Sequence, residues 1–472
     1  MQLYNTLTRS LMKVQPIKEG IISLYSCGPT VYGYAHIGNL RKFIFDDTLR
    51  RTLEAAGFEV KQVMNITDVG HLVSDGDEGD DKLESGAKRE ALTVWQVAAR
   101  YSDAFKLDMK ALNVLPPNGY RDPKNNDSYA RATEFIDEQI AMVKLLIERG
   151  HAYITKQAIY FDVTSIPDYG ELTGQSLDQK EVGARSEVVT DSDKRHPSDF
   201  AVWFFTVGHF ADHTMRWTSP WGEGFPGWHL ECSAIIHSTL GDPIDIHTGG
   251  VDHIGTHHPN EMAQTEAAFG HHLANVWAHS EFVLVDGTKM SKSKQNSYTI
   301  ADITERGFHP LAFRLLTLQA HYRSELNFTW QSLEAAQNSL LNLYAWADLA
   351  HQPELLSQKA SLIDRKLADV QATLENDLDT PGALAVMYEL IGRPVSATEH
   401  REAIVRLDWL FGLDLAKRDD ISDEAKQLID ERQTARGDKD WIKSDEIRDK
   451  LAKLNLTVED TPNGPRWRRA AL

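Results

Sequence analysis

One stretch near the N-terminus constrains the fold more than any other, because it predicts a strand, a turn and a helix in direct succession. Residues 20–26 form a short apolar run rich in strand-forming residues, which predicts a buried parallel strand. The turn that follows has the sequence Cys27-Gly-Pro-Thr-Val-Tyr-Gly-Tyr-Ala-His36-Ile-Gly38-Asn39. Apolar residues then recur at helical spacing from Gly38 onward. The chain therefore starts as the first half of a βαβ unit.

The end of this turn has the residues of a phosphate site. His36, Gly38 and Asn39 would lie at a helix N-terminus beneath a strand end. Free backbone N–H groups and the positive end of the helix dipole favour a polyphosphate there. An ordinary strand, turn and helix would explain so short a motif equally well.

A second strand is predicted over residues 59–65, and it leads into Ile66-Thr67-Asp68. Parallel sheets bind ligands beyond the carboxyl ends of their strands, so Thr67 and the first turn should face one crevice. The acidic run at 74–81 is interpreted as a loop.

Helical patterns cover much of the remaining chain. The predicted helices span 90–112, 130–149, 228–240 and 257–272, and helices dominate from 310 to about 415. A strand at 244–247 is followed by a predicted tight turn at Gly249-Gly250. Two further helices, 422–436 and 441–454, precede a short strand-like stretch near Thr457.

Composition restricts the possible settings and partners. The net charge of −19 argues against indiscriminate nucleic-acid binding, because that affinity comes from lysine and arginine. Residues 416–472 are balanced, with 13 basic and 13 acidic residues, and end in a basic cluster. No apolar run approaches a membrane span, and two cysteines cannot form a disulfide framework. We expect a cytoplasmic protein with no membrane association.

A second motif, Lys289-Met-Ser-Lys-Ser293, follows an apolar run at 281–285. Together with His36-Ile-Gly-Asn39 it resembles the two signatures of class I aminoacyl-tRNA synthetases. Within that class the chain is similar to the cysteinyl-tRNA synthetase family through four motifs and its tail. These are Cys27-Gly-Pro-Thr-Val-Tyr, Asn65-Ile-Thr-Asp68, Pro226-Gly-Trp-His-Leu-Glu-Cys232, His257-His-x-Asn-Glu261, and the segment from Lys439-Asp-Trp441 to Arg466-Trp-Arg-Arg469.

The resemblance implies an α/β fold and a modular chain. A Rossmann-like, doubly wound parallel sheet would be split by an insertion and followed by a helical bundle and a small C-terminal α/β anticodon-binding domain. The expected modules are 1–117 and 226–285 for the catalytic halves, 118–225 for the insertion, 286–320 for the Lys-Met-Ser-Lys-Ser loop and stem-contact region, 321–415 for the bundle, and 416–472 for the anticodon-binding domain.

The resemblance implies a monomeric enzyme that joins cysteine to its tRNA, a cysteine–tRNA ligase. ATP with Mg²⁺ would activate L-cysteine to the adenylate, which is then transferred to the terminal adenosine of tRNA(Cys). One rival is a zinc-dependent cysteine ligase with an aminosugar acceptor, whose family lacks the tRNA-reading tail. The other is a catalytically silent paralogue that binds tRNA or zinc and should have lost His36, Lys289 or Lys292.

One zinc ion per chain is implied by the match at four positions, namely Cys27, Cys232, His257 and Glu261. On a helix, His257 and Glu261 would project from the same face, and Pro259 requires that helix to start at about His257. Spacing alone cannot join the two cysteines, and isolated cytosolic cysteines are commonly inert buried thiols. Zinc would separate cysteine from serine by binding the thiolate.

The remaining site residues also follow from the resemblance. His36, Asn39, Lys289 and Lys292 would be catalytic, and ATP would contact these four as well as Gly38 and Asp252. Asp252 could equally stabilise a turn. Asn39 replaces the family's commoner second histidine, and it offers a neutral hydrogen bond.

The cysteine pocket would comprise Cys27, Thr67, Trp228 and His229, although Trp228 could simply be core. The tRNA contacts would be Asp440, Trp441, Asp445, Arg448 and Trp467. The alternative for this tail is a small helical cap with its tryptophans as core.

Overall fold

The computed structural model describes residues 1–70, 72, 81–174, 193–290, 296–352, 363–391, 397–461 and 464–471. Its centre is a five-stranded parallel sheet with the order β12-β11-β3-β4-β5. The strands are β3 (Ile21–Ser26), β4 (Glu59–Ile66), β5 (Ala130–Arg131), β11 (Ile244–Gly250) and β12 (Ala274–Ser280). Two distant parts of the chain thus supply adjacent strands, which confirms the predicted split parallel sheet.

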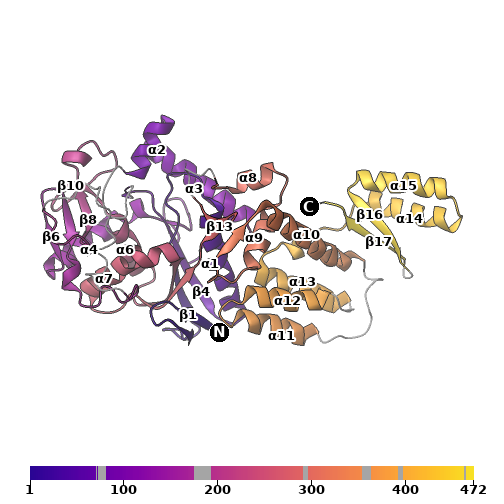
Figure 1. The fold of residues 1–472 in the computed structure, drawn as a ribbon, viewed down its shortest axis with the longest axis horizontal. Coiled ribbons are helices and arrows are strands. Elements are labelled where there is room, and N and C mark those ends of the chain that lie inside the picture. Colours follow the sequence, from indigo (N-terminus) through magenta and orange to yellow (C-terminus); the bar gives the residue numbers. More distant parts are fainter. Residues whose placement is uncertain are drawn as a thin grey trace.

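Helix α1 (Ile37–Ala55) makes the crossover between β3 and β4. Its side chains are buried almost all round, because the sheet lies on one side and the C-terminal helices on the other. Six charged residues of this helix are consequently buried: Arg41, Lys42, Asp46, Asp47, Arg50 and Arg51. In the second half of the sheet, α6 (Trp228–Thr239) contacts α7 (His257–Phe269), as Figure 1 shows.

The segment between the sheet halves differs in detail from the predictions. The helix expected over 90–112 is α3 (Val94–Ala111) and begins four residues late, because a separate, unpredicted helix, α2 (Lys82–Glu90), ends at Ala91 with a left-handed φ of 53°. The helix expected over 130–149 begins only at Ile136 as α4 (Ile136–Glu148), since residues 130–131 pair with the end of β4. The acidic run at 74–81 lies outside the described residues except for Asp81, which caps α2.

The rest of this segment is a second, antiparallel sheet with the order β6-β7-β8-β10-β9. Its strands are β6 (Ala152–Ile154), β7 (Ala158–Phe161), β8 (Phe200–Phe205), β9 (Trp217–Ser219) and β10 (Gly222–Pro226). The predicted turn at Gly249-Gly250 is wrong. These glycines end β11 and pair with His279 and Ser280, and neither has a left-handed φ.

Beyond the sheet a short hairpin and a helical bundle follow. The hairpin is β13 (Val283–Val285) and β14 (Thr288–Lys289), with β15 (Leu326–Phe328) parallel to β13. The helices are α8 (Ile300–Glu305), α9 (Pro310–Leu318), α10 (Trp330–Ala347), α11 (Ile363–Leu374), α12 (Thr380–Ile391) and α13 (Ala397–Phe411). One continuous hydrophobic core runs from α1 through these helices.

The tail forms a separate module that projects beyond the bundle (Figure 1). It contains α14 (Asp423–Gly437), α15 (Trp441–Lys453), and the antiparallel pair β16 (Leu456–Thr461) and β17 (Gly464–Arg469). The module has a small core of its own, which includes Ile429, Leu451 and Trp467. Among the described residues, a hairpin of β1 (Gln2–Asn5) and β2 (Ser10–Lys13) completes the fold, and no helix is long and apolar enough to cross a membrane.

Candidate functional site

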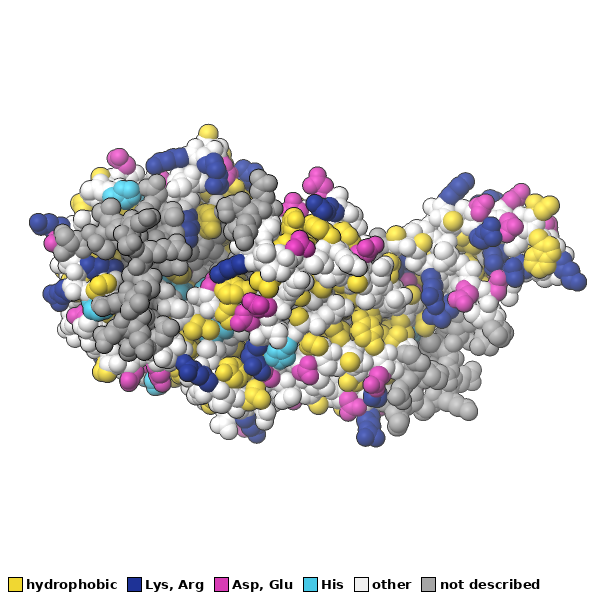
Figure 2. All heavy atoms as spheres, viewed as in Figure 1, with side chains coloured by type: hydrophobic (Ala, Val, Ile, Leu, Met, Phe, Trp, Pro, Cys, Tyr) yellow, Lys and Arg dark blue, Asp and Glu magenta, His cyan; other side chains and the backbone are white. Residues whose placement is uncertain are grey.

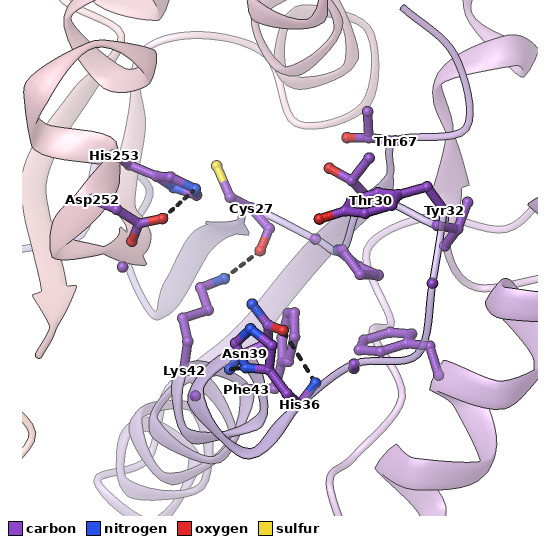
Figure 3. A pocket seen from close by; sticks show the side chains of 18 of the residues that line it. Cys27, Thr30, Tyr32, His36, Asn39, Lys42, Phe43, Thr67, Asp252 and His253 are labelled. Atoms are coloured by element: carbon purple, nitrogen blue, oxygen red, sulfur yellow. Dashed lines mark hydrogen bonds and ion pairs between the residues drawn. The ribbon is translucent and has the colours of Figure 1, made fainter. Parts of the chain in front are cut away.

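A cavity of about 680 Å³ lies at the carboxyl ends of the central strands. The first residue after β3, Cys27, lines it together with Asn65 of β4, Gly250 of β11 and Ser280 of β12. Figure 3 shows Cys27, Thr67 and His253 around this space, with the start of α1 on another side. The location agrees with the crevice predicted from a parallel sheet.

His36 and Asn39 form a reciprocal cap at the start of α1 (Figure 3). The backbone N–H of Asn39 donates to His36 Nδ1 over 3.3 Å, and the N–H of His36 donates to Asn39 Oδ1 over 3.2 Å. Asn39 at the third helical position therefore acts as the side-chain acceptor of a capping box, a role that a histidine fills less readily. Its amide nitrogen remains as a neutral donor beside the cavity.

The two signature motifs meet across this cavity. Lys289 and Met290 line it, and the Lys289 ammonium lies 4.6 Å from the centre of the Phe282 ring. A Cβ atom at Gly38 would lie 2.3 Å from Met290 Cε, so a larger residue there would displace the flexible Met290 side chain that lies against the start of α1. Lys292 lies outside the described residues.

The four predicted metal ligands converge at the base of the cavity. Cys27 follows β3, Cys232 lies on α6, and His257 and Glu261 lie on the first turns of α7. One ligand atom from each lies within 4.8 Å of the others, and all four side chains are buried. His257 Nε2 is 2.8 Å from Glu261 Oε1 and 3.6 Å from Cys232 Sγ. Two sulfurs, a nitrogen and a carboxylate oxygen suit a metal such as zinc, so the cluster is compatible with a metal site.

A second set of donors, not predicted from the sequence, overlaps the first. His247 and His258 join Cys27 and Glu261 within the same 4.8 Å limit. The other oxygen of Glu261 lies 2.7 Å from His247 Nε2, and His258 Nδ1 lies 2.8 Å from His279 Nε2. Such outer contacts orient the inner ligands. The sequence signal was a histidine within the strand β11, at the end of its Ile244-Asp-Ile-His247 run.

Burial and neighbouring charges shift the pKa values of three members of the cluster. Burial alone would raise the pKa of Cys27, but hydrogen bonding to Cys232 and the charges of His258 and His247 hold that pKa well below its ordinary value. Burial raises the pKa of Cys232, with Cys27 and Glu261 adding to the effect. Burial opposes a charge on His257, yet Glu261 raises its pKa to about 10. These shifts favour a Cys27 thiolate beside a protonated His257.

Trp228 and His229 both contact His257. The Trp228 ring stacks on the His257 ring at 4.4 Å with an interplanar angle of 3°, and it lines the cavity. His229 is fully buried, and its Nδ1 lies 3.0 Å from His257 Nδ1. The structure therefore places His229 behind His257 instead of on the cavity wall.

Thr67 lines the cavity, and its side chain makes a contact that the sequence did not predict. Its hydroxyl donates to Glu231 Oε1, which also accepts a hydrogen bond of 3.2 Å from Asn65 Nδ2. Burial raises the pKa of Glu231 well above its ordinary value. The signal for Glu231 was its position inside the motif that ends at Cys232.

Asp252 lies at the mouth of the cavity. Its side chain is 63% exposed and lies 4.0 Å from His253 Nε2. Figure 3 shows the two side chains facing each other. This position leaves Asp252 accessible to a ligand that enters the cavity.

The predicted tRNA contacts divide into two groups. Asp440 caps α15 by accepting from the Lys443 N–H, while Trp441 is 55% exposed and stacks with Arg436 at 5.4 Å. The exposed pair Asp445 and Arg448 lies on the same helix. Trp467 is instead 5% exposed in the core of the module, so its ring is not available to an unstacked base. Figure 2 shows hydrophobic side chains beside lysine and arginine side chains at the outer end of this module.

Solved structures define the class of protein to which this fold and cavity belong. Mycobacterium tuberculosis methionyl-tRNA synthetase in complex with methionyl-adenylate matches with a TM-score of 0.60 and 13% identity, over 84% of this chain and 92% of that one. The Agrobacterium radiobacter K84 LeuRS-tRNA-LeuAMS complex matches with a TM-score of 0.59 and 11% identity, over 86% and 85%. The chain has the fold of a class I aminoacyl-tRNA synthetase.

Sequence comparisons assign the family. The model described as "tRNA synthetases class I (C) catalytic domain" matches residues 13–338, and "Cysteinyl-tRNA ligase anticodon binding domain" matches 418–468. A "Cysteine--tRNA ligase 1" of Burkholderia lata is 43% identical over 98% of this chain and 96% of its own length. The "Cysteine--tRNA ligase" of Treponema denticola is 37% identical over 99% of both. The chain belongs to the cysteinyl-tRNA synthetase family.

Proposed function

We propose that this protein activates L-cysteine with ATP and Mg²⁺, and then transfers the cysteinyl group to the terminal adenosine of tRNA(Cys). The observation that carries the proposal is the juxtaposition of two sites in one cavity. The donors Cys27, Cys232, His257 and Glu261 lie at its base, and the two class I signatures border its mouth. A thiol held at the base would present its carboxylate towards the nucleotide side.

In this proposal the start of α1 binds the triphosphate. The helix N-terminus, the Asn39 amide and the Lys289 ammonium are fixed donors near the developing charge of the α-phosphoryl group. Lys292 would assist from the same motif. Asp252 at the mouth would contact the nucleoside.

A zinc ion held by the four donors would select cysteine over serine, because it binds a thiolate far better than a hydroxyl. Cys27, Cys232 and Glu261 would supply negative charge, and His257 would lose its proton on loading. Trp228 would fix the orientation of His257 by stacking. The cavity needs no editing site if this discrimination is sufficient.

The tail would read the anticodon. Trp441 offers an exposed aromatic plane, and Asp445 and Arg448 offer charged groups on the same helix. We place the module boundaries at 117/118, 225/226, 285/286, 320/321 and 415/416. We further propose a cytoplasmic monomer, in keeping with two free thiols.

The alternatives have less support. An aminosugar-transferring ligase has no need of residues 418–468, which match an anticodon-binding domain. A silent paralogue has no reason to keep His36, Lys289 and Lys292 together.

Cysteine-dependent exchange of pyrophosphate into ATP, compared across the amino acids with and without tRNA, tests the proposal. We expect exchange with cysteine, little with serine, about one zinc per chain, and charging of tRNA(Cys). Rapid exchange with serine would contradict zinc selection, and transfer to an aminosugar but not to tRNA would favour the rival ligase.

A further inference from the structure

Glu231 is a buried carboxyl group in the cavity that the reaction as described does not use. It lies in the first turn of α6, directly before the ligand Cys232. The residue is 2% exposed, yet it lines the cavity together with Thr67 and Trp228. A carboxyl group in such a place is costly unless it has strong partners.

The two oxygens of Glu231 have different surroundings. Oε1 accepts hydrogen bonds from the Thr67 hydroxyl and from the side-chain amide of Asn65. The oxygen of that same amide accepts a hydrogen bond of 2.6 Å from the Gly28 N–H. Oε2 is buried and has no hydrogen-bond partner among the described residues. Among the residues that the structure describes, no lysine or arginine forms an ion pair with Glu231. An oriented carboxyl group thus has one oxygen left for a donor that the protein does not provide.

The Thr67 contact fixes this orientation from a different part of the chain. Thr67 follows β4, whereas Glu231 belongs to α6, so the bond spans two elements of the site. In Figure 3, Thr67 lies beside Thr30 on the loop that follows β4. Asp252, the other carboxylate in the cavity lining near the ligands, is largely exposed at the mouth and is a weaker candidate for a small buried cation.

We infer that Glu231 Oε2 receives the α-ammonium group of the substrate cysteine, with Thr67 and Asn65 as positioning residues. This inference rests on the proposed function. A cysteine bound through its sulfur to the donors at Cys232 would carry its ammonium only two carbon atoms from that sulfur. Because Glu231 is adjacent to Cys232 on α6 and lines the same cavity, the ammonium can form a charge-assisted hydrogen bond there. Glu231 would then distinguish amino acids from other thiols.

Two ligands separate the ammonium contact from the metal contact. 3-Mercaptopropionate has the thiol and carboxylate of cysteine and lacks only the ammonium group. Calorimetry on the zinc-loaded full chain without ATP should show that wild type binds L-cysteine at least about tenfold more tightly than 3-mercaptopropionate, as expected for a hydrogen bond to a charged group. Equal binding of the two thiols by wild type would overturn the inference, whereas binding of neither would overturn the proposed function instead.

The variant Glu231→Gln keeps the size of the side chain and replaces its carboxyl group with an amide, which cannot become a carboxylate acceptor. It should weaken cysteine binding by about 10- to 100-fold and change 3-mercaptopropionate binding less than about threefold. Thr67→Val, which removes the orienting hydroxyl, should shift the same ratio in the same direction by a smaller factor. Glu266→Gln, at an exposed pair with His272 on α7, is the matched control and should leave both affinities unchanged.

Equal loss of both ligands in Glu231→Gln would assign the residue to the structure of the metal site and overturn the inference. Zinc content measured on each variant checks this reading independently. If Glu231→Gln fails to fold, the ratio of the two thiols in wild type and Thr67→Val still decides: an unchanged ratio in Thr67→Val contradicts the role given to its hydroxyl.

Discussion

The imidazole of His257 is held on several sides, and this fixes what the ring can do. Nε2 faces Glu261 Oε1 at 2.8 Å, Nδ1 faces His229, and Trp228 stacks on the ring face. A ligand histidine whose plane and second nitrogen are both constrained binds a cation with little reorganisation. Each of these contacts comes from α6 or α7, so the packing of these two helices determines the geometry of the cluster.

The first residue-scale prediction concerns Cys232→Ser. Because a hydroxyl is a poor substitute for a thiolate ligand, the variant should lose bound zinc and cysteine-dependent pyrophosphate exchange together. Metal analysis and the exchange assay on the same preparation measure both. Full exchange activity in protein that contains no zinc would contradict the assigned role.

Gly28 gives a second prediction at this scale. A Cβ atom there would lie 1.6 Å from the carbonyl oxygen of Asn65, and backbone cannot move aside as a flexible side chain can. Gly28→Ala should therefore lower the free energy of unfolding by about 3 kcal/mol or more. Gly33→Ala, where no atom lies within 4 Å of the new Cβ, is the control. Equal denaturation midpoints in urea for both variants would refute this explanation.

Helix α1 links the catalytic sheet to the helical bundle through a buried ionic cluster. Asp47 Oδ2 pairs with Arg51 at 2.7 Å and with Arg314 of α9 at 2.5 Å. Its other oxygen accepts from the Leu115 N–H, and Arg314 also donates to the carbonyl of Phe411 in α13. Helix α1, which begins at the cavity, is thus fixed to three distant segments.

Removing the shared carboxylate should be costly at the scale of this element. Asp47→Ala leaves two buried guanidinium groups without it, so we expect a loss of about 3–5 kcal/mol in urea unfolding. Glu54→Ala removes a partly exposed pair with Arg50 on the same helix and should cost about 1 kcal/mol or less. A similar loss in both variants would show that the buried cluster has no special weight.

The pH dependence of this difference has a defined sign. Burial opposes the charge of Asp47, but Arg314 and Arg51 outweigh it and lower its pKa. The stabilisation is therefore fully present above the unfolded pKa of about 4 and is lost as the pH falls through the lower folded value. The difference in stability between wild type and Asp47→Ala should be constant above about pH 5 and shrink in stronger acid.

The hairpin of β13 and β14 gives another prediction at the element scale. Lys289 at its end lines the cavity on the phosphate side, so Lys289→Ala should reduce adenylate formation by about 100-fold through loss of one positioned cation. Cysteine binding measured by calorimetry without ATP should stay unchanged. Lys144→Ala on the exposed face of α4 serves as control. A comparable loss of cysteine affinity would show that Lys289 contacts cysteine and that its assignment to ATP is wrong.

At the scale of the whole molecule, the hydrophobic core of the tail is separate from the larger core of the bundle and sheet. The larger one is continuous from the sheet through α13, while the tail has its own. The two are joined at Asp348, a fully buried residue that pairs with Arg418 and Arg469 at 2.7 Å and 2.6 Å. The tail is thus attached by a few polar contacts and can be removed without opening the larger core.

A chain that ends at Arg418 should separate the two steps of the reaction. It keeps the Arg418–Asp348 pair and every described residue of the cavity, so cysteine-dependent pyrophosphate exchange should persist within about threefold. Charging of tRNA(Cys) should fall by at least about 10-fold, because the anticodon contacts are lost. In the full chain, equal charging of native and anticodon-altered tRNA would refute the anticodon role.

Local patterns in the sequence predicted the parts of the site that lie close together in the chain. The strand and helix around Cys27 and His36 follow from apolar periodicity, and Pro259 required α7 to begin near His257. The two signature motifs identified the class, because their residue types match the charges that the reaction develops. Together these features predicted the parallel sheet and the crevice, whereas the choice of metal ligands came from the resemblance to the cysteinyl-tRNA synthetase family.

Tertiary structure alone decided which distant residues meet. Residues 130–131 carry a helical pattern but complete the sheet beside β4, and Trp467 looks like a surface aromatic but fills the core of the tail. Cys27 approaches Cys232, and Glu231 meets Thr67, only because β3, β4 and α6 converge at one edge of the sheet. Hydrophobic periodicity shows which face of a segment is buried, but it does not show which element covers that face. The hydrophobic effect is non-directional, and pairing depends on how the elements pack.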